Sequence, residues 1–360
     1  MNPPALEIRP FTPDAYEEVC DLYDRAWPGD VDRRKIAFRW LHEENPFAQA
    51  DKGYLLGYNS GVLAGYWGRM PMRFYHRGRP MECVFTQEAL VDPQFRRQGV
   101  ARELMEAATS DPALYLSLWH NEKIVSLLES SGWSSVGRYR TRKKILRADG
   151  LATWKLGNAR LGKLIGAPIN LFLEATRRDS RSLGSMEVRT IDTFGTEADH
   201  FFEKTAGEIA FIADRTSRVL NWRFSDIPHR SFHRLAVFGG SKGQFRGYMI
   251  GEVTTLPDEE LLRGDVVDFL CAPGDTEALE ALLAQMHRFF RQKKVDFAVL
   301  LQTHPAFSEL LTTRGFRAAR RPGVGSQLLY LDRRAQPTPP AANSYDGWFI
   351  THGDSDGHLW

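Results

Sequence analysis

The chain has 360 residues, of which 42% are hydrophobic and 12% aromatic. It is long enough for two domains with sizeable cores, and its composition excludes a disordered chain. Its formal net charge of +2 gives no electrostatic case for nucleic-acid binding, which a strongly basic face usually signals.

Cysteine and hydropathy patterns point to a cytoplasmic protein. The three cysteines lie far apart in the sequence, and their small odd number favours a reducing compartment. Residues 1–13 carry proline and charge where a signal peptide needs an apolar run, and no apolar stretch reaches 18 residues. We also expect no metal site, because His229 and His233 have neither a glutamate between them nor a third ligand nearby.

The first half of the chain predicts alternating helices and strands. Helical patterns cover residues 14–25 and the segment around Trp40, and an antiparallel hairpin follows at 53–58 and 65–75. A buried strand at 83–91 leads to a helix at 101–108. A strand at 114–118 then precedes a last helix that ends at Gly132.

The strand at 83–91 and the next helix are joined by a tight basic turn, Arg96-Arg97-Gln98-Gly99-Val100-Ala101. Free N–H groups at a helix start, the helix dipole and arginines all favour a bound anion. Gly99 and Ala101 let a bulky phosphate approach the backbone. The pattern therefore predicts a pyrophosphate site, with a purely structural basic turn as the alternative. It is neither the dinucleotide fingerprint nor a nucleotide P-loop.

The spacing of Arg96, Gly99 and Ala101 resembles the acetyl-coenzyme A signature of the GNAT acetyltransferases. Leu90-Val91-Asp92-Pro93 also looks like the strand ending of that family. The resemblance implies an N-acetyltransferase that uses acetyl-coenzyme A as co-substrate, needs no metal and modifies an amino group of a small molecule. It further implies that main-chain N–H groups near Leu90 and Val91 hold the pantetheine, and that residues 96–101 hold the pyrophosphate.

The same resemblance implies a carboxylate near the strand that accepts the proton of the amine. Glu82 and Glu88 are the candidates, and the period of two residues predicts that both lie on one face. We rank Glu88 first because it is nearer the strand end; a solvated or salt-bridged role is the alternative for either. Asn121 matches a family asparagine that contacts pantetheine, or is a simple helix cap. Leu128 stands where the family often has a tyrosine that protonates the leaving thiolate.

Landmarks of the first half recur in the second at offsets of 180 to 183 residues: Trp40 as Trp222, Leu90 as Leu270 and Gly132 as Gly315. This repeat indicates two copies of one α/β unit with a mixed sheet. The order of their elements resembles the GNAT fold, which implies two tandem GNAT-like acyl-coenzyme A N-acyltransferase domains. The recurring tryptophans favour core packing over stacking on a sugar ring.

The second copy predicts the same element order. A helical pattern at 197–210 and a helix around Trp222 precede a hairpin at 233–238 and 244–254, and strands follow at 265–270 and 297–301. Asp275 and Glu277 stand where a pyrophosphate needs donors and positive charge. Since like charges oppose binding, we expect this copy to hold no coenzyme A and to be a structural or substrate-shaping domain.

These patterns divide the chain into a domain with the acetyl-coenzyme A signature (1–144), a connector (145–185), a degenerate domain (186–333), and a Pro-rich spacer with an aromatic and acidic tail (334–360). In the connector, residues 155–173 predict either a packed inter-domain segment or an amphipathic helix on a membrane surface. Three glycines and Pro168 weaken a long helix and favour the packed segment. The basic run at 138–144 favours an exposed, solvated edge strand over a site for anionic ligands.

The C-terminal tail is rich in aromatic residues, so we expect it to dock onto the body. It also looks like the ending of acetyltransferases encoded with bacterial polysaccharide-assembly enzymes, which favours an amino sugar as acceptor. Two other functions stay open. A Fem-type aminoacyl transferase would need a basic face for tRNA, and a non-catalytic acyl-coenzyme A sensor would explain Leu128. The sequence does not indicate the oligomeric state.

Overall fold

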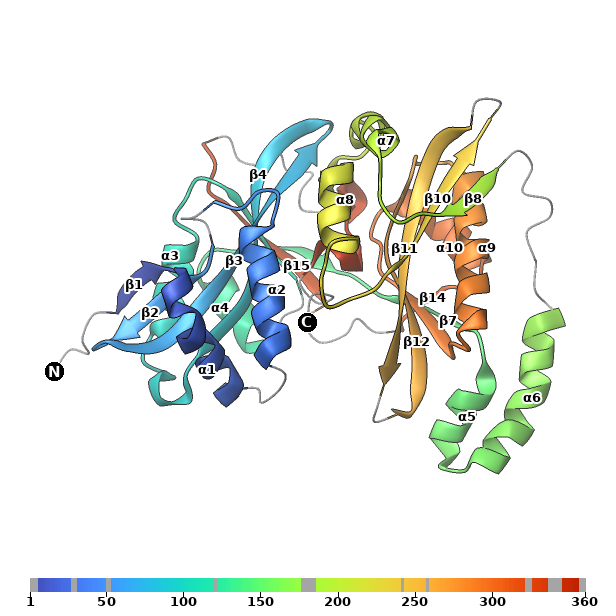
Figure 1. Cartoon of the computed structure of the whole chain (residues 1–360), viewed down its shortest axis with the longest axis horizontal. Helices are drawn as coiled ribbons and strands as arrows, with labels where there is room; N and C mark the ends of the chain where they lie inside the picture. The colour runs from blue at the N-terminus through green and yellow to red at the C-terminus, as the bar shows by residue number, and fades with distance from the viewer. Residues whose placement is uncertain are drawn as a thin grey trace.

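The computed structural model describes residues 6–26, 31–49, 53–118, 122–175, 186–240, 243–256, 259–320, 326–335 and 345–355. Asn121 and the Pro-rich stretch at 336–340 lie outside these residues. The described residues form two mixed β-sheets that lie side by side, with helices packed on them (Figure 1). The predicted α/β class with two mixed-sheet units is therefore confirmed.

The first sheet contains seven strands in spatial order, with a short addition at one side. In order they are β1 (Glu7–Pro10), β2 (Leu55–Asn59), β3 (Val62–His76), β4 (Arg79–Val91), β5 (Leu114–Ser117), β15 (Gln327–Asp332) and β6 (Ser134–Arg138). Beside β3 lie β9 (Phe211–Ala213) and then β16 (Trp348–Phe349). The core on one face includes residues of α1 (Tyr16–Ala26) and α2 (Val31–Glu43), and that on the other includes residues of α3 (Val100–Ala108) and α4 (Glu122–Ser130).

The second sheet repeats this arrangement with strands in the equivalent order. They are β14 (Arg317–Ala318), β7 (Arg142–Ile145), β13 (Phe297–Leu300), β12 (Leu261–Cys271), β11 (Gln244–Leu256), β10 (His233–Gly239) and β8 (Glu187–Thr190). Its helices are α7 (Thr196–Ala206), α8 (Ser217–Phe224), α9 (Thr276–Gln292) and α10 (Ser308–Thr313). The apolar residues of α9 recur with helical period and pack onto the sheet core.

The two sheets exchange one strand each. β7 follows β6 in the chain but lies in the second sheet between β13 and β14, while β15 returns to the first sheet between β5 and β6 (Figure 1). The boundary expected after residue 144 thus falls inside β7. The expectation that residues 138–144 form an exposed edge is wrong for β7, because this strand has a hydrogen-bonded neighbour on each side.

Trp40 and Trp222 pack against each other between the two units. Their rings stack with centroids 4.7 Å apart. The indole N–H of Trp40 donates to the carbonyl of Trp222 at 3.1 Å, and that of Trp222 donates to the carbonyl of Trp40 at 3.4 Å. Both side chains are buried, which confirms the core-packing interpretation.

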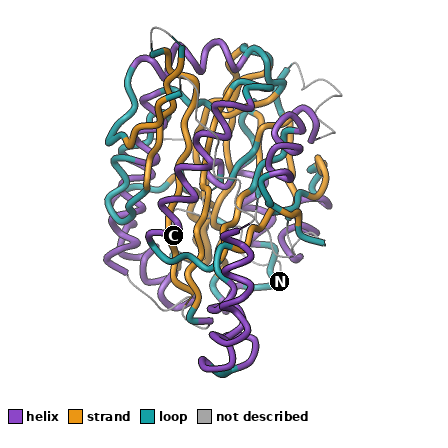
Figure 2. The backbone as a smooth tube through the Cα atoms, turned by 90° about the vertical axis from the view of Figure 1, so that its right-hand side faces the viewer, coloured by secondary structure: helices purple, strands orange, loops and turns teal. Residues whose placement is uncertain are grey.

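A helical hairpin connects the units in sequence. α5 (Ala148–Leu156) and α6 (Ala159–Ala175) project beyond the second sheet (Figures 1 and 2). Glycines and Pro168 are expected to weaken a long helix here, yet α6 has 17 residues and contains Pro168. Gly162 and Gly166 face the backbone of α5, and a Cβ atom at Gly162 would lie 2.5 Å from Cα of Thr153. Glycine is thus required at these positions for the two helices to approach so closely.

Arg215, two residues after the end of β9, connects both sheets and the C-terminal tail through hydrogen bonds. Its guanidinium is 3% exposed; it donates to Asp268 of β12 at 3.1 Å, to Asp354 of the tail at 2.9 Å and to the carbonyl of Ala213 at 3.1 Å. Burial opposes its charge, but the two carboxylates outweigh burial and raise the pKa of Arg215. The tail is therefore docked, as its composition predicts.

Replacing this arginine tests the role of the buried charge cluster. Arg215→Met leaves Asp268 and Asp354 buried without their cation, so we expect the free energy of unfolding to fall by about 3–5 kcal/mol in urea denaturation. The triple variant Arg215→Met/Asp268→Asn/Asp354→Asn should recover much of this loss, because no buried charge is left unpaired. A single variant as stable as the wild type would contradict the proposed role.

Candidate functional site

The predicted anion site lies at the corner between β4 and α3. β4 ends at Val91, a 3-10 turn covers Pro93–Phe95, and α3 begins at Val100. Asp92 holds the corner: its buried carboxylate accepts the N–H of Gln94 at 2.9 Å and contacts the guanidinium of Arg25 at 3.1 Å. These contacts fix the direction in which the chain enters the helix.

The N-terminus of α3 is open to solvent and has no side-chain cap. Gly99 is the N-cap residue with φ of 90°, and Arg97 also has a positive φ of 64°. Residues 96–99 are exposed. The first N–H groups of a helix have no intrahelical acceptor, so the donors of Val100 and Ala101 lie beside two exposed arginines. The corner has the geometry and the charge of an anion site.

The equivalent corner of the second unit is filled by a carboxylate of the protein itself. Asp275 caps α9 by accepting the N–H of Ala278 at 3.1 Å, and Arg246 binds the same carboxylate at 2.7 and 2.9 Å. The helix donors and the nearby cation are thus already satisfied. The two units differ at this corner as the sequence predicts.

Strands β4 and β5 separate before β4 ends. Their parallel pairing covers only residues 83–85 of β4, opposite residues 114–116 of β5. β4 continues to Val91 with β3 on its other side, and no described strand pairs with it on the β5 side beyond Phe85. The main-chain groups around Leu90 and Val91 on this side are thus not used by the sheet, and the carbonyl of Val91 accepts a hydrogen bond from the guanidinium of Arg96 at 3.2 Å.

A β-bulge interrupts β4 at Glu88. Trp67 pairs with Ala89 and Gly68 with Gln87, so Glu88 is an extra residue on β4. The bulge shifts the alternation of side chains by one. The expectation that Glu82 and Glu88 share a face is therefore wrong.

The contacts of the two glutamates reflect this difference. Glu82 lies opposite Arg73 of β3 in the sheet. It is two residues before Val84 and so shares a face with it, and Val84 belongs to the core beside α3. Glu88 accepts the hydroxyl of Tyr54 at 3.4 Å, and Tyr54 belongs to the core on the side of α1 and α2. Glu82 instead lines a smaller pocket of about 330 Å³. Of the two, only Glu88 lies beyond Phe85, in the part of β4 that is not paired with β5.

The side chains around Glu88 include polar groups that the sequence did not predict. Gln87 is 5% exposed, and neither its amide nitrogen nor its amide oxygen has a hydrogen-bond partner among the described residues. The ring of His42 lies 4.5 Å from that of Tyr54, and burial lowers the pKa of His42 to about 3, so its imidazole is neutral. The amide of Gln87 can therefore both donate and accept a hydrogen bond beside the bulge.

The other predicted site residues contribute less. Leu128 is fully buried in the core between α3 and α4, so it offers no proton to a leaving group. Asn121 lies outside the described residues. No cluster of three or more potential metal ligands occurs in the part of the chain that the structure describes.

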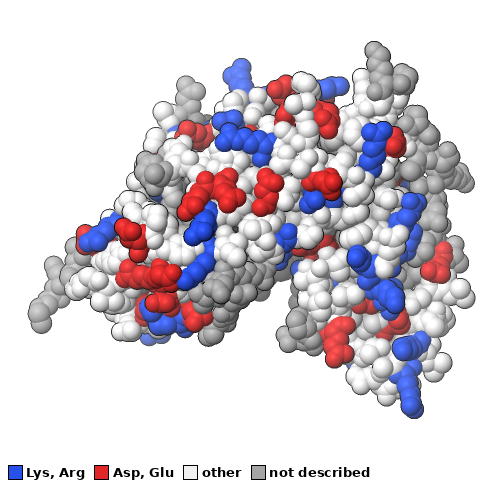
Figure 3. Space-filling view, in the orientation of Figure 1, with Lys and Arg blue, Asp and Glu red and all other residues white. Residues whose placement is uncertain are grey.

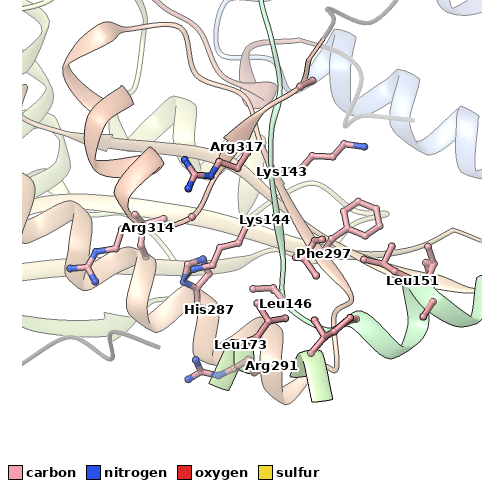
Figure 4. A pocket seen from close by; sticks show the side chains of 18 of the residues that line it. Lys143, Lys144, Leu146, Leu151, Leu173, His287, Arg291, Phe297, Arg314 and Arg317 are labelled. Carbon is pink, nitrogen blue, oxygen red and sulfur yellow. Dashed lines mark hydrogen bonds between the residues drawn. The ribbon is translucent and has the colours of Figure 1, made fainter. Parts of the chain in front are cut away.

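A large pocket lies elsewhere, beside the second sheet. It has a volume of about 1190 Å³ and is lined by residues of β7, α9, α10 and the α5–α6 hairpin. Lys144, His287 and Arg291 line it together with apolar side chains such as Leu146 and Leu173 (Figure 4). None of the residues predicted from the sequence to form the site lines this pocket.

Comparisons with known proteins agree with this fold. The whole chain is similar to a GCN5-related N-acetyltransferase from Anabaena variabilis ATCC 29413, with a TM-score of 0.62 and 11% identity over 92% of this chain and 73% of that one. It is similar to a GCN5-related N-acetyltransferase from Kribbella flavida (TM-score 0.58, 13% identity, 91% and 70%). It is also similar to Saccharomyces cerevisiae N-myristoyltransferase with bound myristoyl-CoA (TM-score 0.57, 15% identity, 96% and 82%).

At the level of sequence, no curated protein matches the chain. A family model does match part of it, over residues 7–113, which include β4, the basic turn and α3. The chain thus has a GNAT-like fold of two mixed-sheet units, and the segment that forms the open corner matches the acetyltransferase (GNAT) domain family.

Proposed function

We propose that the protein is an N-acyltransferase that moves an acyl group, most simply acetyl, from acyl-coenzyme A to an amino group of a small molecule. The observation that carries this proposal is the open corner between β4 and α3. It combines an uncapped helix N-terminus, two exposed arginines and an unpaired strand edge. The family match over residues 7–113 supports the same function.

In this proposal the corner binds the diphosphate of coenzyme A. N–H groups of Gly99, Val100 and Ala101 donate to the phosphate oxygens, and Arg96 and Arg97 add positive charge. Gln98 belongs to the same turn. The positive φ of Gly99 supports this role, because a glycine there lets the ligand lie against the backbone. The N–H groups near Leu90 and Val91 hold the pantetheine along the free edge of β4.

In this proposal the side chains that act on the substrates lie at the bulge in β4. Acyl-coenzyme A supplies the activated acyl group, and Glu88 accepts the proton of the attacking amine directly or through water. Tyr54 keeps the Glu88 carboxylate in place through its hydroxyl. The buried amide of Gln87 has the donors and the acceptor needed to orient the amine or the thioester oxygen.

The leaving thiolate departs without a dedicated acid at the position of Leu128. Because that side chain is apolar and fully buried, it transfers no proton. A thiol has a pKa of about 8.5, so the thiolate is a reasonable leaving group by itself. The second unit then acts as a structural or substrate-shaping domain, because its own corner is filled by Asp275. The resemblance of the tail favours an amino sugar of a surface polysaccharide pathway as acceptor.

Charge reversal at the corner tests the binding site. Arg97→Glu keeps a non-glycine residue at the same positive φ but puts a negative charge beside the phosphates. We expect the Kd for acetyl-coenzyme A to rise at least about tenfold, or ~1.4 kcal/mol, in calorimetric titration. Arg288→Glu, on an exposed part of α9, should leave the Kd unchanged. An unchanged Kd for Arg97→Glu would show that the ligand binds elsewhere.

The proposed base is tested by removing its charge while keeping its shape. Glu88→Gln should lower kcat by about 10²–10⁴-fold, because proton transfer from the amine is lost, and leave the Kd for acetyl-coenzyme A unchanged. The measurement is thiol release from acetyl-coenzyme A with a panel of amines. Glu82→Gln is the matched control and should keep its activity. A kcat for Glu88→Gln within twofold of wild type would exclude Glu88 as base, and binding without turnover of any amine would favour a sensor.

A further inference from the structure

The α5–α6 hairpin carries most of the exposed large apolar side chains of the protein. Among the described residues, eight of the eleven such side chains lie on it: Trp154, Leu156, Leu161, Leu164, Ile165, Ile169, Leu171 and Phe172. Leu164, Leu171 and Phe172 are 65–73% exposed. The hairpin extends away from the body in both backbone views (Figures 1 and 2). So much exposed apolar surface in one projecting element indicates a binding surface.

An ordinary helix pair in water buries large apolar side chains between its helices, whereas this hairpin has small residues there. The only buried residues described in α6 are Gly162 and Gly166, which lie against the backbone of α5. Small residues and the hydrogen bonds of Asn170 to Ala148 and Asp149 therefore hold the two helices together, and most of the large apolar side chains are exposed. Helix pairs in lipid pack in this way, because their large side chains are solvated by acyl chains while small residues allow close contact.

The charges of the hairpin indicate which surface it meets. Its loop end carries Lys155, Arg160 and Lys163, all exposed, and no acidic residue occurs between positions 150 and 173. Figure 3 shows Lys and Arg atoms at the end of this projecting lobe. Apolar side chains beside unopposed cations, with a tryptophan among them, are typical of segments that lie at the interface of a negatively charged membrane.

The pocket at the base of the hairpin continues this surface. Trp154, Ile169 and Leu173 of the hairpin line it. Basic side chains outnumber acidic ones in its lining: there are six lysines and arginines (Lys143, Lys144, Lys155, Arg291, Arg314 and Arg317) and two glutamates (Glu259 and Glu280). Apolar and basic surface thus extends from the loop end of the hairpin to the body. The same positive charge argues against a symmetric dimer through this face, which would bring like charges together.

We propose that the α5–α6 hairpin is a membrane-binding element that inserts its exposed apolar side chains into the interface of a bilayer containing anionic lipids. It lies in the interface and does not cross the bilayer, since none of the described helices is sufficiently long and apolar to span it. This role is independent of the acyl-transfer proposal, because the hairpin packs beside the second sheet and shares no residue with the β4–α3 corner.

The proposal is tested by sedimentation of the full-length protein with vesicles. We expect partition to phosphatidylcholine vesicles with about 30% phosphatidylserine to exceed partition to pure phosphatidylcholine at least about tenfold, and to weaken as salt rises. Leu164→Ser/Leu171→Ser/Phe172→Ser should abolish it. Lys155→Glu/Arg160→Glu/Lys163→Glu should remove the preference for anionic vesicles. Val62→Ser, at an exposed apolar residue of β3 far from the hairpin in sequence, is the control and should bind as wild type does.

Three results would overturn the proposal. One is wild-type protein that stays in the supernatant with both vesicles, and another is binding that the triple serine variant retains. The third is a dimer, seen by analytical ultracentrifugation without vesicles, that the serine variant loses, which would make the face a contact between two copies. Thermal melting of each variant shows that the fold is kept, and acetyl-coenzyme A titration without vesicles should give the same Kd for all of them.

Discussion

A buried positive charge constrains the arrangement of the whole molecule. Arg215 lies between the two sheets, where its guanidinium is stable only while carboxylates from two other parts of the chain contact it. One of these, Asp268, belongs to the second sheet, and the other, Asp354, belongs to the tail. The Arg215 cluster, the Trp40–Trp222 stack and the exchanged strands therefore act together. Any shift of one unit against the other would leave a charge or an indole N–H unpaired.

The two units share a strand order and differ at the corner on which the proposed ligand binding depends. In the second unit a carboxylate of the chain satisfies the N-terminus of α9, whereas in the first unit α3 begins at a glycine and its donors face solvent. β12 has an equivalent bulge, with Val267 as its extra residue, so the second difference is the side chain there: β4 carries Glu88 where β12 carries a valine. The proposed chemistry depends on both features, and neither requires a change of fold.

Local patterns in the sequence predicted the elements well, because hydrophobic period and turn residues are local properties. The hairpin β2–β3, the strand β4 and the helix α3 lie where these patterns place them, and the basic turn joins them as expected. Three features escaped prediction because they depend on distant contacts. The bulge at Glu88 forms only when β3 pairs with β4, and the exchange of β7 and β15 depends on both sheets. Helix propensity alone disfavours glycine within a helix. Gly162 and Gly166 nevertheless stand in α6, because they allow its close packing against α5.

The exchanged strands also set the order in which the protein can form during synthesis. β15 fills the first sheet between β5 and β6, but its residues leave the ribosome nearly two hundred positions after β6 (Ser134–Arg138 against Gln327–Asp332). Until then the first sheet has a gap between β5 and β6, next to the strand that carries the proposed site. A chain that stops before β15 leaves these two edges unpaired, and exposed strand edges of this kind favour aggregation. The first sheet is complete only once β15 has been made.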